Sequence, residues 1–373
     1  MNVPLRAREL GIAVGTGTPG PLDAITDVAG VRVGSVTLHE GDDVRTGVTM
    51  IVPSEADVAE EQLFAGCHTL NGNGELTGLE WVRESGRLTT PIALTNTHSV
   101  GVVRDALVAA SVRARGEDDW LNWALPVVGE TYDGLLNDIN GAHVRPEHVD
   151  QALARAAGGP VEEGNVGGGT GMICHGFKGG IGTASRVIGK KDGGYTVGVL
   201  VQANHGRRER LSVAGAPVGR VIGTDVVPDP WDEAAPGAAG SGSIIVVCAT
   251  DAPLLPHQCR RLAQRTALGV ARTGGAGEHS SGDIMIAFST ARQGVPPSGV
   301  EADAQPVTVA VTMFVDSHIN PLYHAAIEAT EAAIVNALLA AETTTGRRGV
   351  TAYGLDPELL VGALRRFGGL GLG

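Results

Sequence analysis

The sequence predicts a layered α/β protein whose sheets are buried between helices. Apolar runs that suit strands alternate along the chain with helical stretches, and several of these runs are apolar on both faces. Such strands need cover on both sides, which favours layered sheets over an open antiparallel sandwich. Hydrophobic residues make up 43% and charged residues 18% of the 373 residues, so we expect a large folded core.

The N-terminal half is expected to begin with a hairpin or a sheet edge and to continue with a strand that leads into a helix. Ser99 is a suitable N-cap for that helix, and Pro146 suits the first turn of the next one. The predicted order is strand 31–38, strand 47–52, strand 91–96, helix 100–115, an apolar run at 123–128 and helix 146–157.

The C-terminal half continues the alternation after a break. Residues 214–242 are rich in Gly, Pro, Ala and acidic residues, which is the composition of a linker. The predicted order is strand 185–188, strand 195–201, the linker, strand 243–250, helix 255–271, strand 283–289, strand 307–314 and helix 321–341.

Charge and composition narrow the classes of partner. The net charge of −13 and the lack of a dense Lys/Arg run argue against nucleic acid and anionic membranes, and favour small or peptide-like ligands. No signal peptide or membrane-spanning run is present, so a cytoplasmic location is expected. Cysteines 67, 174, 248 and 259 lack metal-type spacing and are expected to be reduced core residues; no metal and no cofactor is expected.

Ser243 is the candidate nucleophile. It follows Gly242 and opens the apolar run 243–250. Glycine can adopt the strained backbone that lets the next hydroxyl attack the preceding carbonyl, so Ser243 can become a new N-terminus. Its free α-amine, with an ordinary pKa of about 7.7–8, would then be a base for the hydroxyl beside it. The local sequence also fits a plain Gly/Ser loop before a core strand.

Other polar residues lie at predicted strand ends. The amide of Asn204 can stabilise an oxyanion, and Ser281 with Asp283 can form a hydrogen-bonded relay at the start of a strand. Glu130 and Tyr132 follow an apolar run at a spacing of two, so both can project toward one pocket, where a carboxylate can bind an ammonium group. Turn formation, capping and solvation are the alternative roles of these residues.

A glycine-rich segment supports a different hypothesis. Gly167–Gly171 reads Gly-Gly-Gly-Thr-Gly and can cradle a phosphate with backbone amides, as in a nucleotide-binding protein. No Walker lysine follows it, and the next residues do not form a clear helix. The histidines show no His-Glu-x-x-His pattern, and Asp316-Ser317-His318 cannot form a triad by adjacency alone.

Several motifs in order resemble the DmpA-type (P1 family) aminopeptidases, which include the β-peptidyl aminopeptidases. The resemblance spans nearly the whole chain. It implies an αββα sandwich similar to that of N-terminal nucleophile hydrolases, with different strand connectivity. The motifs are residues 20–31, 95–101, 129–134, 201–204, 242–247, 249–254 and 281–284.

The resemblance also implies roles for the candidate residues. The chain would cut itself at Gly242–Ser243 into an α chain (1–242) and a β chain (243–373) that together form one domain. In the serine aminopeptidase so formed, the implied roles are nucleophile for Ser243, oxyanion binding for Asn204, proton transfer or orientation for Ser281 and Asp283, and substrate ammonium binding for Glu130 with Tyr132 nearby.

The implied substrates are short peptides, amides or esters with a free amine, of L-, D- or β-amino acids, and the implied assembly is a homo-oligomer of αβ units. Two departures stand out: Asp283 replaces the glutamate of some relatives, and Ser241 is a second serine before the expected cut. We favour Ser243 because Gly-Ser leads directly into the strand. The alternatives are an acyltransferase of the ornithine acetyltransferase sort, whose nucleophile is usually threonine, and a scaffold without catalysis.

Overall fold

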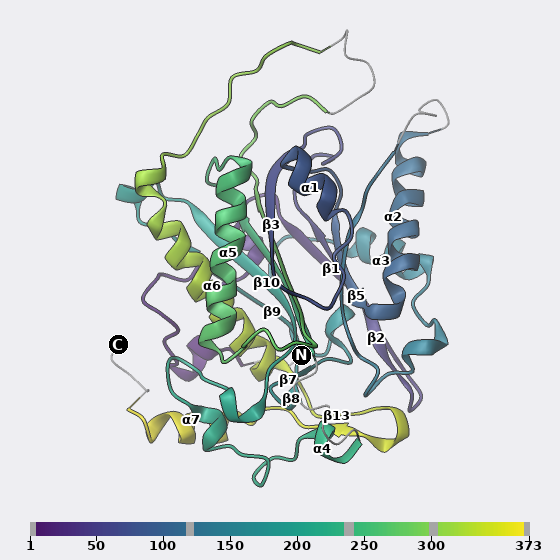
Figure 1. Ribbon diagram of the computed structural model, residues 1–373, viewed down its shortest axis with the longest axis vertical. Helices are drawn as coiled ribbons and strands as arrows, with labels where there is room; N and C mark the ends of the chain where they lie inside the picture. Colours follow the sequence, from purple (N-terminus) through teal and green to yellow (C-terminus); the bar gives the residue numbers. More distant parts are fainter. Residues whose placement is uncertain (1–4, 117–122, 235–241, 298–304, 369–373) are drawn as a thin grey trace.

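Two sheets are stacked between two layers of helices. The computed structural model describes residues 5–116, 123–234, 242–297 and 305–368. Figure 1 shows helices α5 (Pro256–Arg272) and α6 (Asn320–Ala340) on one outer face, and α2 (Val100–Arg115) and α3 (Pro146–Arg155) on the other. The predicted αββα sandwich is therefore confirmed.

The larger sheet has six strands and carries the predicted nucleophile at its centre. Strands β11 and β12 are parallel neighbours, and β10 runs antiparallel to β11 on its other side. In spatial order the strands are β4 (Arg87–Leu88), β3 (Leu63–Gly72), β12 (Gly282–Ser289), β11 (Ser243–Thr250), β10 (Thr196–Asn204) and β9 (Gly180–Val187).

The smaller sheet has four strands and includes the predicted early hairpin. Its first two strands pair antiparallel, whereas its last two are parallel. In spatial order they are β1 (Arg32–Glu40), β2 (Val44–Val52), β5 (Ile92–Asn96) and β6 (Val127–Thr131). The remaining elements are short: α1 (Leu79–Ser85), α4 (Pro230–Ala234), α7 (Pro357–Arg365), and the strand pairs β7 (Ile173–Cys174) with β8 (Phe177–Lys178) and β13 (Thr344–Thr345) with β14 (Thr351–Ala352).

Alternation along β11 explains why the sequence shows an unbroken apolar run there. Ile244 and Val246 pack into the core under α5 and α6, whereas Ile245 and Val247 pack into the core between the two sheets. A third apolar cluster lies between the smaller sheet and α2 with α3. Because both faces of this strand are covered, both sets of side chains are apolar.

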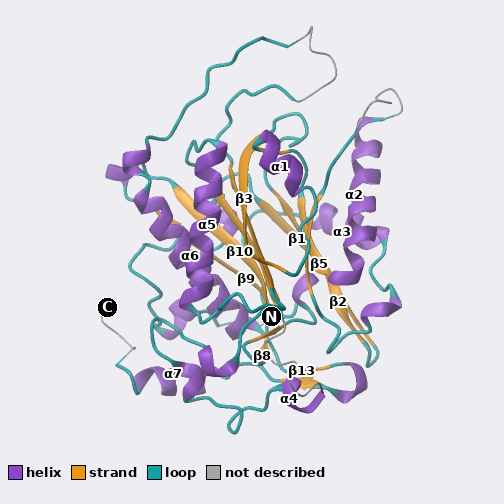
Figure 2. Ribbon diagram, in the orientation of Figure 1, coloured by secondary structure: helices purple, strands orange, loops and turns teal. Residues whose placement is uncertain are grey.

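Two predicted segments differ from the structure. Residues 307–314, predicted to be a strand, form no strand: they belong to an extended loop at the top of Figure 2. The side chain of Gln293 bonds to the backbone of Thr312 there, at 3.0 and 2.8 Å. The alternating pattern is genuine, but no strand among the described residues pairs with it. In the predicted linker 214–242, residues 214–234 are packed, with Val218 and Trp231 buried, and residues 235–241 lie outside the described part of the chain.

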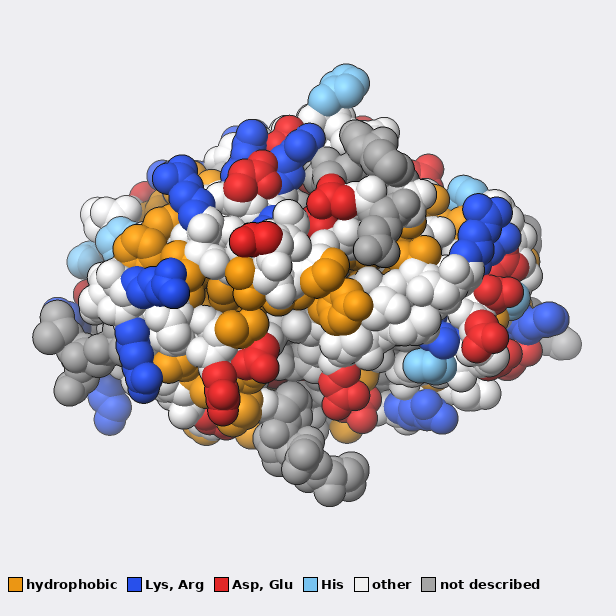
Figure 3. Space-filling model, turned by 90° about the horizontal axis from the view of Figure 1, so that it is seen from below, with side chains coloured by type: hydrophobic (Ala, Val, Ile, Leu, Met, Phe, Trp, Pro, Cys, Tyr) orange, Lys and Arg blue, Asp and Glu red, His pale blue; other side chains and the backbone are white. Residues whose placement is uncertain are grey.

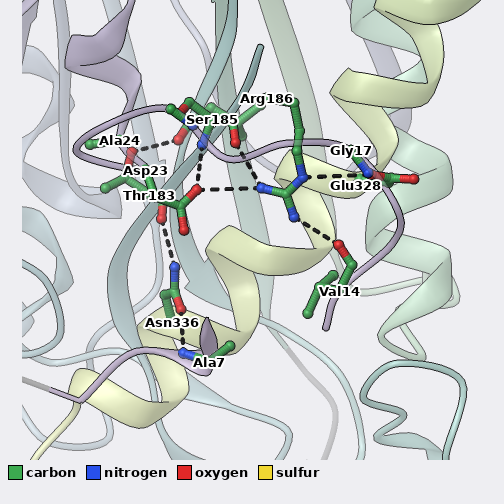
Figure 4. Close-up of polar contacts among 12 residues, drawn as sticks. Ala7, Val14, Gly17, Asp23, Ala24, Thr183, Ser185, Arg186, Glu328 and Asn336 are labelled. Carbon is green, nitrogen blue, oxygen red and sulfur yellow. Dashed lines mark hydrogen bonds and ion pairs between the residues drawn. The ribbon is translucent and has the colours of Figure 1, made fainter. Parts of the chain in front are cut away.

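Buried charges fasten the N-terminal segment to the larger sheet and α6 (Figure 4). The Arg186 guanidinium on β9 contacts Asp23 at 3.4 Å and Glu328 of α6 at 3.5 Å, and it donates to the carbonyl of Val14 at 2.8 Å. Asn336 of α6 links the segment a second time, because its side chain accepts from the backbone N–H of Ala7 at 3.0 Å.

The surface shows mixed charge on the face seen from below, where acidic, basic and hydrophobic side chains alternate (Figure 3). Among the described residues, no helix has both the length and the apolar character needed to cross a membrane.

Candidate active site

The candidate site lies where the central strands of the larger sheet begin or end, and the strand directions bring its residues together there. Ser243 is the first residue of β11 and Gly282 is the first residue of the parallel strand β12. Asn204 is the last residue of β10, which is antiparallel to β11, so it lies directly opposite Ser243. Three segments far apart in sequence therefore meet at the same edge.

Ser243 is held from two sides. Its side-chain oxygen Oγ accepts a hydrogen bond from the Gly282 N–H at 3.0 Å, and the residue is buried. The preceding Gly242 lies against β10: a Cβ atom added there would be 1.9 Å from the carbonyl oxygen of Asn204. A residue with a side chain cannot occupy this position without moving the backbone, which explains the glycine.

The amide of Asn204 is oriented by two backbone groups. Its Oδ1 accepts from the N–H of Ile173 at 2.7 Å, which fixes the amide so that Nδ2 is the donor on its other side. Nδ2 donates to the carbonyl oxygen of Tyr132 at 3.0 Å. A buried, preoriented amide donor is the type of group that stabilises an oxyanion.

Ser281 and Asp283 form the hydrogen-bonded pair that the sequence predicted as a relay. The Ser281 hydroxyl donates to Oδ1 of Asp283 at 2.5 Å, and both residues are buried. Burial raises the pKa of Asp283 to about 6, although the bonds from Ser281 and from the backbone of Ile244 oppose this rise. Asp283 therefore titrates near neutral pH.

Glu130 enters the site from the smaller sheet. It lies on β6 and is only 3% exposed. Its carboxylate accepts from the backbone N–H of Glu75 at 2.9 Å and from the Thr97 hydroxyl. Burial raises its pKa, and the two hydrogen bonds partly oppose the rise. A buried carboxylate forms strong charge-assisted hydrogen bonds with an ammonium group that reaches it.

The loop at Gly74 lies between Glu130 and the start of β12, next to the candidate nucleophile. A Cβ atom at Gly74 would be 3.0 Å from both Oε1 of Glu130 and Cα of Gly282, whose N–H bonds to Ser243. The backbone at Gly74 and Gly282 thus lies between the Glu130 carboxylate and Ser243. A hollow of about 490 Å³ opens beside this loop, lined among others by Leu76, Trp81, Leu125 and Ile284.

Tyr132 follows β6 directly, and its ring lies against Gly134. The side chain is 43% exposed, and the contact with the site is made by the backbone carbonyl that accepts from Asn204. The second serine before the expected cut, Ser241, lies outside the described residues. Sequence reasoning missed the backbone donors of Ile173, Glu75 and Gly282, because a backbone N–H carries no sequence signal.

The glycine-rich loop is not arranged as a phosphate cradle. Its amides already have partners inside the protein: the N–H of Gly167 donates to Thr37 at 2.9 Å and that of Gly168 donates to Thr49 at 3.1 Å. Glycines 167–169 are buried. This loop packs against the smaller sheet, so the nucleotide-binding alternative is not favoured.

Comparisons with known proteins show what the chain and its fold are similar to. The chain is 48% identical to the β-peptidyl aminopeptidase BapA of Sphingosinicella microcystinivorans over 97% of its own length and 92% of that protein. It superposes on a Burkholderia sp. β-aminopeptidase with a TM-score of 0.91 and 55% identity, covering 98% of this chain and 99% of that one. An L-aminopeptidase D-Ala-esterase/amidase from Ochrobactrum anthropi, described as a variant of the Ntn (N-terminal nucleophile) hydrolase fold, gives a TM-score of 0.88 and 43% identity, with 98% and 99% covered.

The fold and these relatives together define an aminopeptidase with an Ntn-type hydrolase fold. The family model described as peptidase family S58 matches residues 23–352, and the chain belongs to that family. The acyltransferase and scaffold alternatives are not favoured by these relatives.

Proposed function

We propose that the chain matures by cutting its own Gly242–Ser243 bond and then uses Ser243 to remove N-terminal residues from short peptides. The observation that carries this proposal is the edge of the larger sheet, where Ser243 faces Asn204 and its Oγ lies 3.0 Å from the Gly282 N–H. Maturation leaves residues 1–242 and 243–373 together in one domain.

The cut proceeds through the hydroxyl of Ser243. Its Oγ attacks the carbonyl carbon of Gly242, the C–N bond breaks, and the nitrogen of Ser243 becomes a free amine while Gly242 is held as an ester. Water then hydrolyses the ester, giving the Gly242 carboxylate and restoring the hydroxyl. The close approach of Gly242 to the backbone carbonyl of Asn204 supports this route, since it restricts where the bond to be cut can lie.

Peptide hydrolysis repeats the same chemistry on a substrate. The α-amine of Ser243 takes the hydroxyl proton and Oγ attacks the substrate carbonyl. One N–H of the Asn204 amide stays on the Tyr132 carbonyl, and the other N–H of Nδ2 donates to the oxyanion. Ser281 and Asp283 orient the new amine and exchange its proton. The substrate C–N bond then breaks, and the leaving amine takes the proton held by the α-ammonium of Ser243. Water hydrolyses the resulting ester, which releases the acyl group and restores the hydroxyl.

Glu130 binds the ammonium group of the substrate, and Tyr132 borders the same entrance. A fixed carboxylate near the nucleophile sets the distance between the free amine and the bond that is cut, which selects exopeptidase activity. The Gly74 loop, in contact range of both Glu130 and Gly282, supports this placement.

The substrate class that we propose is peptides and amides with an N-terminal β-amino acid. Two of the similar proteins are named for β-peptidyl or β-aminopeptidase activity. The hollow beside the Gly74 loop supplies apolar side chains such as Leu76 and Trp81 for the side chain of the removed residue.

We also propose that processed αβ units assemble into a cytoplasmic homo-oligomer. The extended segment 305–315 supports self-association because its apolar side chains face solvent in the single chain. The exposed side chains are Val307, Val309, Val311, Met313 and Val315. Light scattering should give a mass of several units; a monomer at micromolar concentration would contradict this assembly.

Denaturing mass spectrometry of the wild type beside Ser243→Ala tests the maturation. We expect two wild-type fragments, the smaller beginning at Ser243, and an intact variant without turnover. Matched p-nitroanilides of a β-amino acid and its α-amino counterpart then test the substrate class. An uncut wild type contradicts the cleavage step, whereas faster turnover of the α-amino compound contradicts only the substrate class.

A further inference from the structure

A cluster of three potential metal ligands lies next to Asn204, the residue proposed above to bind the oxyanion. Cys174 ends β7, His175 lies in the turn to β8, and His205 directly follows β10. Their ligand atoms all lie within 4.8 Å of one another, and all three residues are buried. None of these side chains takes part in the hydrolysis proposed above.

The hydrogen bonds of the cluster leave nitrogen lone pairs unused. Nδ1 of His175 lies 3.0 Å from the carbonyl oxygen of Arg207, so Nδ1 carries the proton and Nε2 is a free acceptor. Within the described part of the chain, Nε2 of His175 is buried and has no hydrogen-bond partner, so its lone pair is free. On His205 the nitrogen that faces Sγ of Cys174 is Nδ1, and Nε2 then carries the proton. An imidazole whose other nitrogen donates to a backbone carbonyl is typical of a metal ligand.

We propose that Cys174, His175 and His205 bind one copper(I) ion. The distance from Sγ of Cys174 to Nδ1 of His205 is 3.8 Å. Bonds of about 2.3 Å to sulfur and about 2.0 Å to nitrogen at trigonal angles separate two ligand atoms by about 3.7 Å, so little movement is needed. The thiol loses its proton on binding, and no electron is transferred.

The charges around the cluster favour a monovalent ion over zinc(II). Arg208 lies close, since its Nε donates to the carbonyl of His175 at 2.9 Å. Copper(I) with one thiolate and two neutral imidazoles has no net charge, whereas zinc(II) with the same ligands adds a positive charge beside this buried guanidinium. Thiolate and imidazole are both ligands that copper(I) accepts.

The position of the cluster suggests what the ion does. The N–H of Ile173, the residue before Cys174, holds Oδ1 of Asn204, the residue before His205. An ion that joins Cys174 and His205 therefore fastens the β7–β8 hairpin to the end of β10. Its effect is to stabilise the support of Asn204 rather than to enter the reaction.

Anaerobic titration of the untagged, reduced protein with copper(I) tests the proposal, with bicinchoninate as the competing chelator. We expect one copper(I) ion per chain held against the chelator, with a thiolate-to-copper absorption band in the ultraviolet and a higher melting temperature. Cys174→Ser and His205→Asn should each lose the tightly held ion. Cys67→Ser, which changes a cysteine outside the cluster, is the control and should keep it.

A second measurement uses only the wild type, so its result does not depend on whether the variants fold. X-ray absorption at the copper edge should show one sulfur and two nitrogen neighbours. Failure of the wild type to compete with the chelator, two sulfur neighbours, retention of the ion by a folded Cys174→Ser variant, or tighter binding of zinc(II) than of copper(I) would each overturn the proposal.

Discussion

Asn204 and Ser243 face each other as the last residue of β10 and the first residue of β11, in an antiparallel register that continues to Val197 and Thr250. The pairing places the side chains of the two residues on the same face of the sheet, at the ends of neighbouring strands. Because both residues are part of a buried sheet, the geometry is present before the chain is cut.

Replacing Asn204 by alanine should lower kcat by about 10²–10³, the usual cost of losing one oxyanion donor. Self-cleavage should slow as well, since it passes through a similar tetrahedral intermediate. Steady-state assays of the fully cleaved enzyme measure kcat. The time course of fragment formation measures the rate of self-cleavage. An unchanged kcat in a folded variant would show that another group binds the oxyanion.

Gly242→Ala should impair self-cleavage, because the added Cβ would be 1.9 Å from the Asn204 carbonyl oxygen and must displace the bond to be cut. We expect intact precursor to accumulate during expression. Gly101→Ala is the matched control, since a Cβ at Gly101 has no atom within 4 Å among the described residues and it lies on a helix. Equal processing of the two variants would refute the steric explanation.

Glu130→Gln should lower kcat/KM for free-amine substrates by about 10–100-fold, because a charged hydrogen bond worth about 1.5–3 kcal/mol becomes a neutral one. Most of the change should appear in KM. Self-cleavage should be retained, as it involves no substrate ammonium. A comparison with amine-blocked substrates provides the control: the wild type should discriminate strongly against them and the variant much less.

The pKa of Asp283, raised from 3.8 to about 6, makes two pH effects measurable. The folded state binds this proton more tightly than the unfolded chain does, so the group's contribution to stability falls as the pH rises from about 4 to about 6 and is constant above that. Activity that needs the ionised carboxylate should rise with an apparent pKa near 6.

Asp283→Asn should remove the acidic limb from the plot of kcat/KM against pH. It should also remove the change in stability between about pH 4 and about pH 6, which urea unfolding at several pH values measures. A profile with the same limb in the variant would assign the ionisation to another group.

Arg186→Ala should destabilise the protein by about 3–5 kcal/mol, because it removes the guanidinium shared by the carboxylates of Asp23 and Glu328, which keep only backbone N–H donors at hydrogen-bond distance within the described chain. Arg104→Ala, which removes an exposed pair with Asp105, should change the free energy of unfolding by less than about 1 kcal/mol. Urea unfolding of the two variants at neutral pH makes the comparison. Similar values would show that the Arg186 network contributes little.

Local patterns predicted much of the fold. The unbroken apolar run of β11 and the helical pattern of α2 follow from side-chain chemistry that neighbouring residues decide. The predicted cap of α2 is wrong: among the residues that the structure describes, the Ser99 side chain makes no capping hydrogen bond, and the Asn96 side chain instead accepts from the N–H groups of His98 and Ser99. The same reasoning predicted a strand at 307–314, where the alternation is real but no partner strand is present in the described chain. Pairing is a long-range property, so an alternating segment shows only that a strand can form.

The sequence by itself determined Gly242 before a serine that opens a buried strand, together with a polar residue at the end of each neighbouring strand. Only the tertiary structure decided that Asn204 lies opposite Ser243, that Glu130 approaches from the other sheet, and that Cys174 lies beside His205. Apolar periodicity specifies which face of an element is buried, because burial depends on the residue's own chemistry. Strand order and direction depend on how all the elements pack together, and they bring distant residues to one edge.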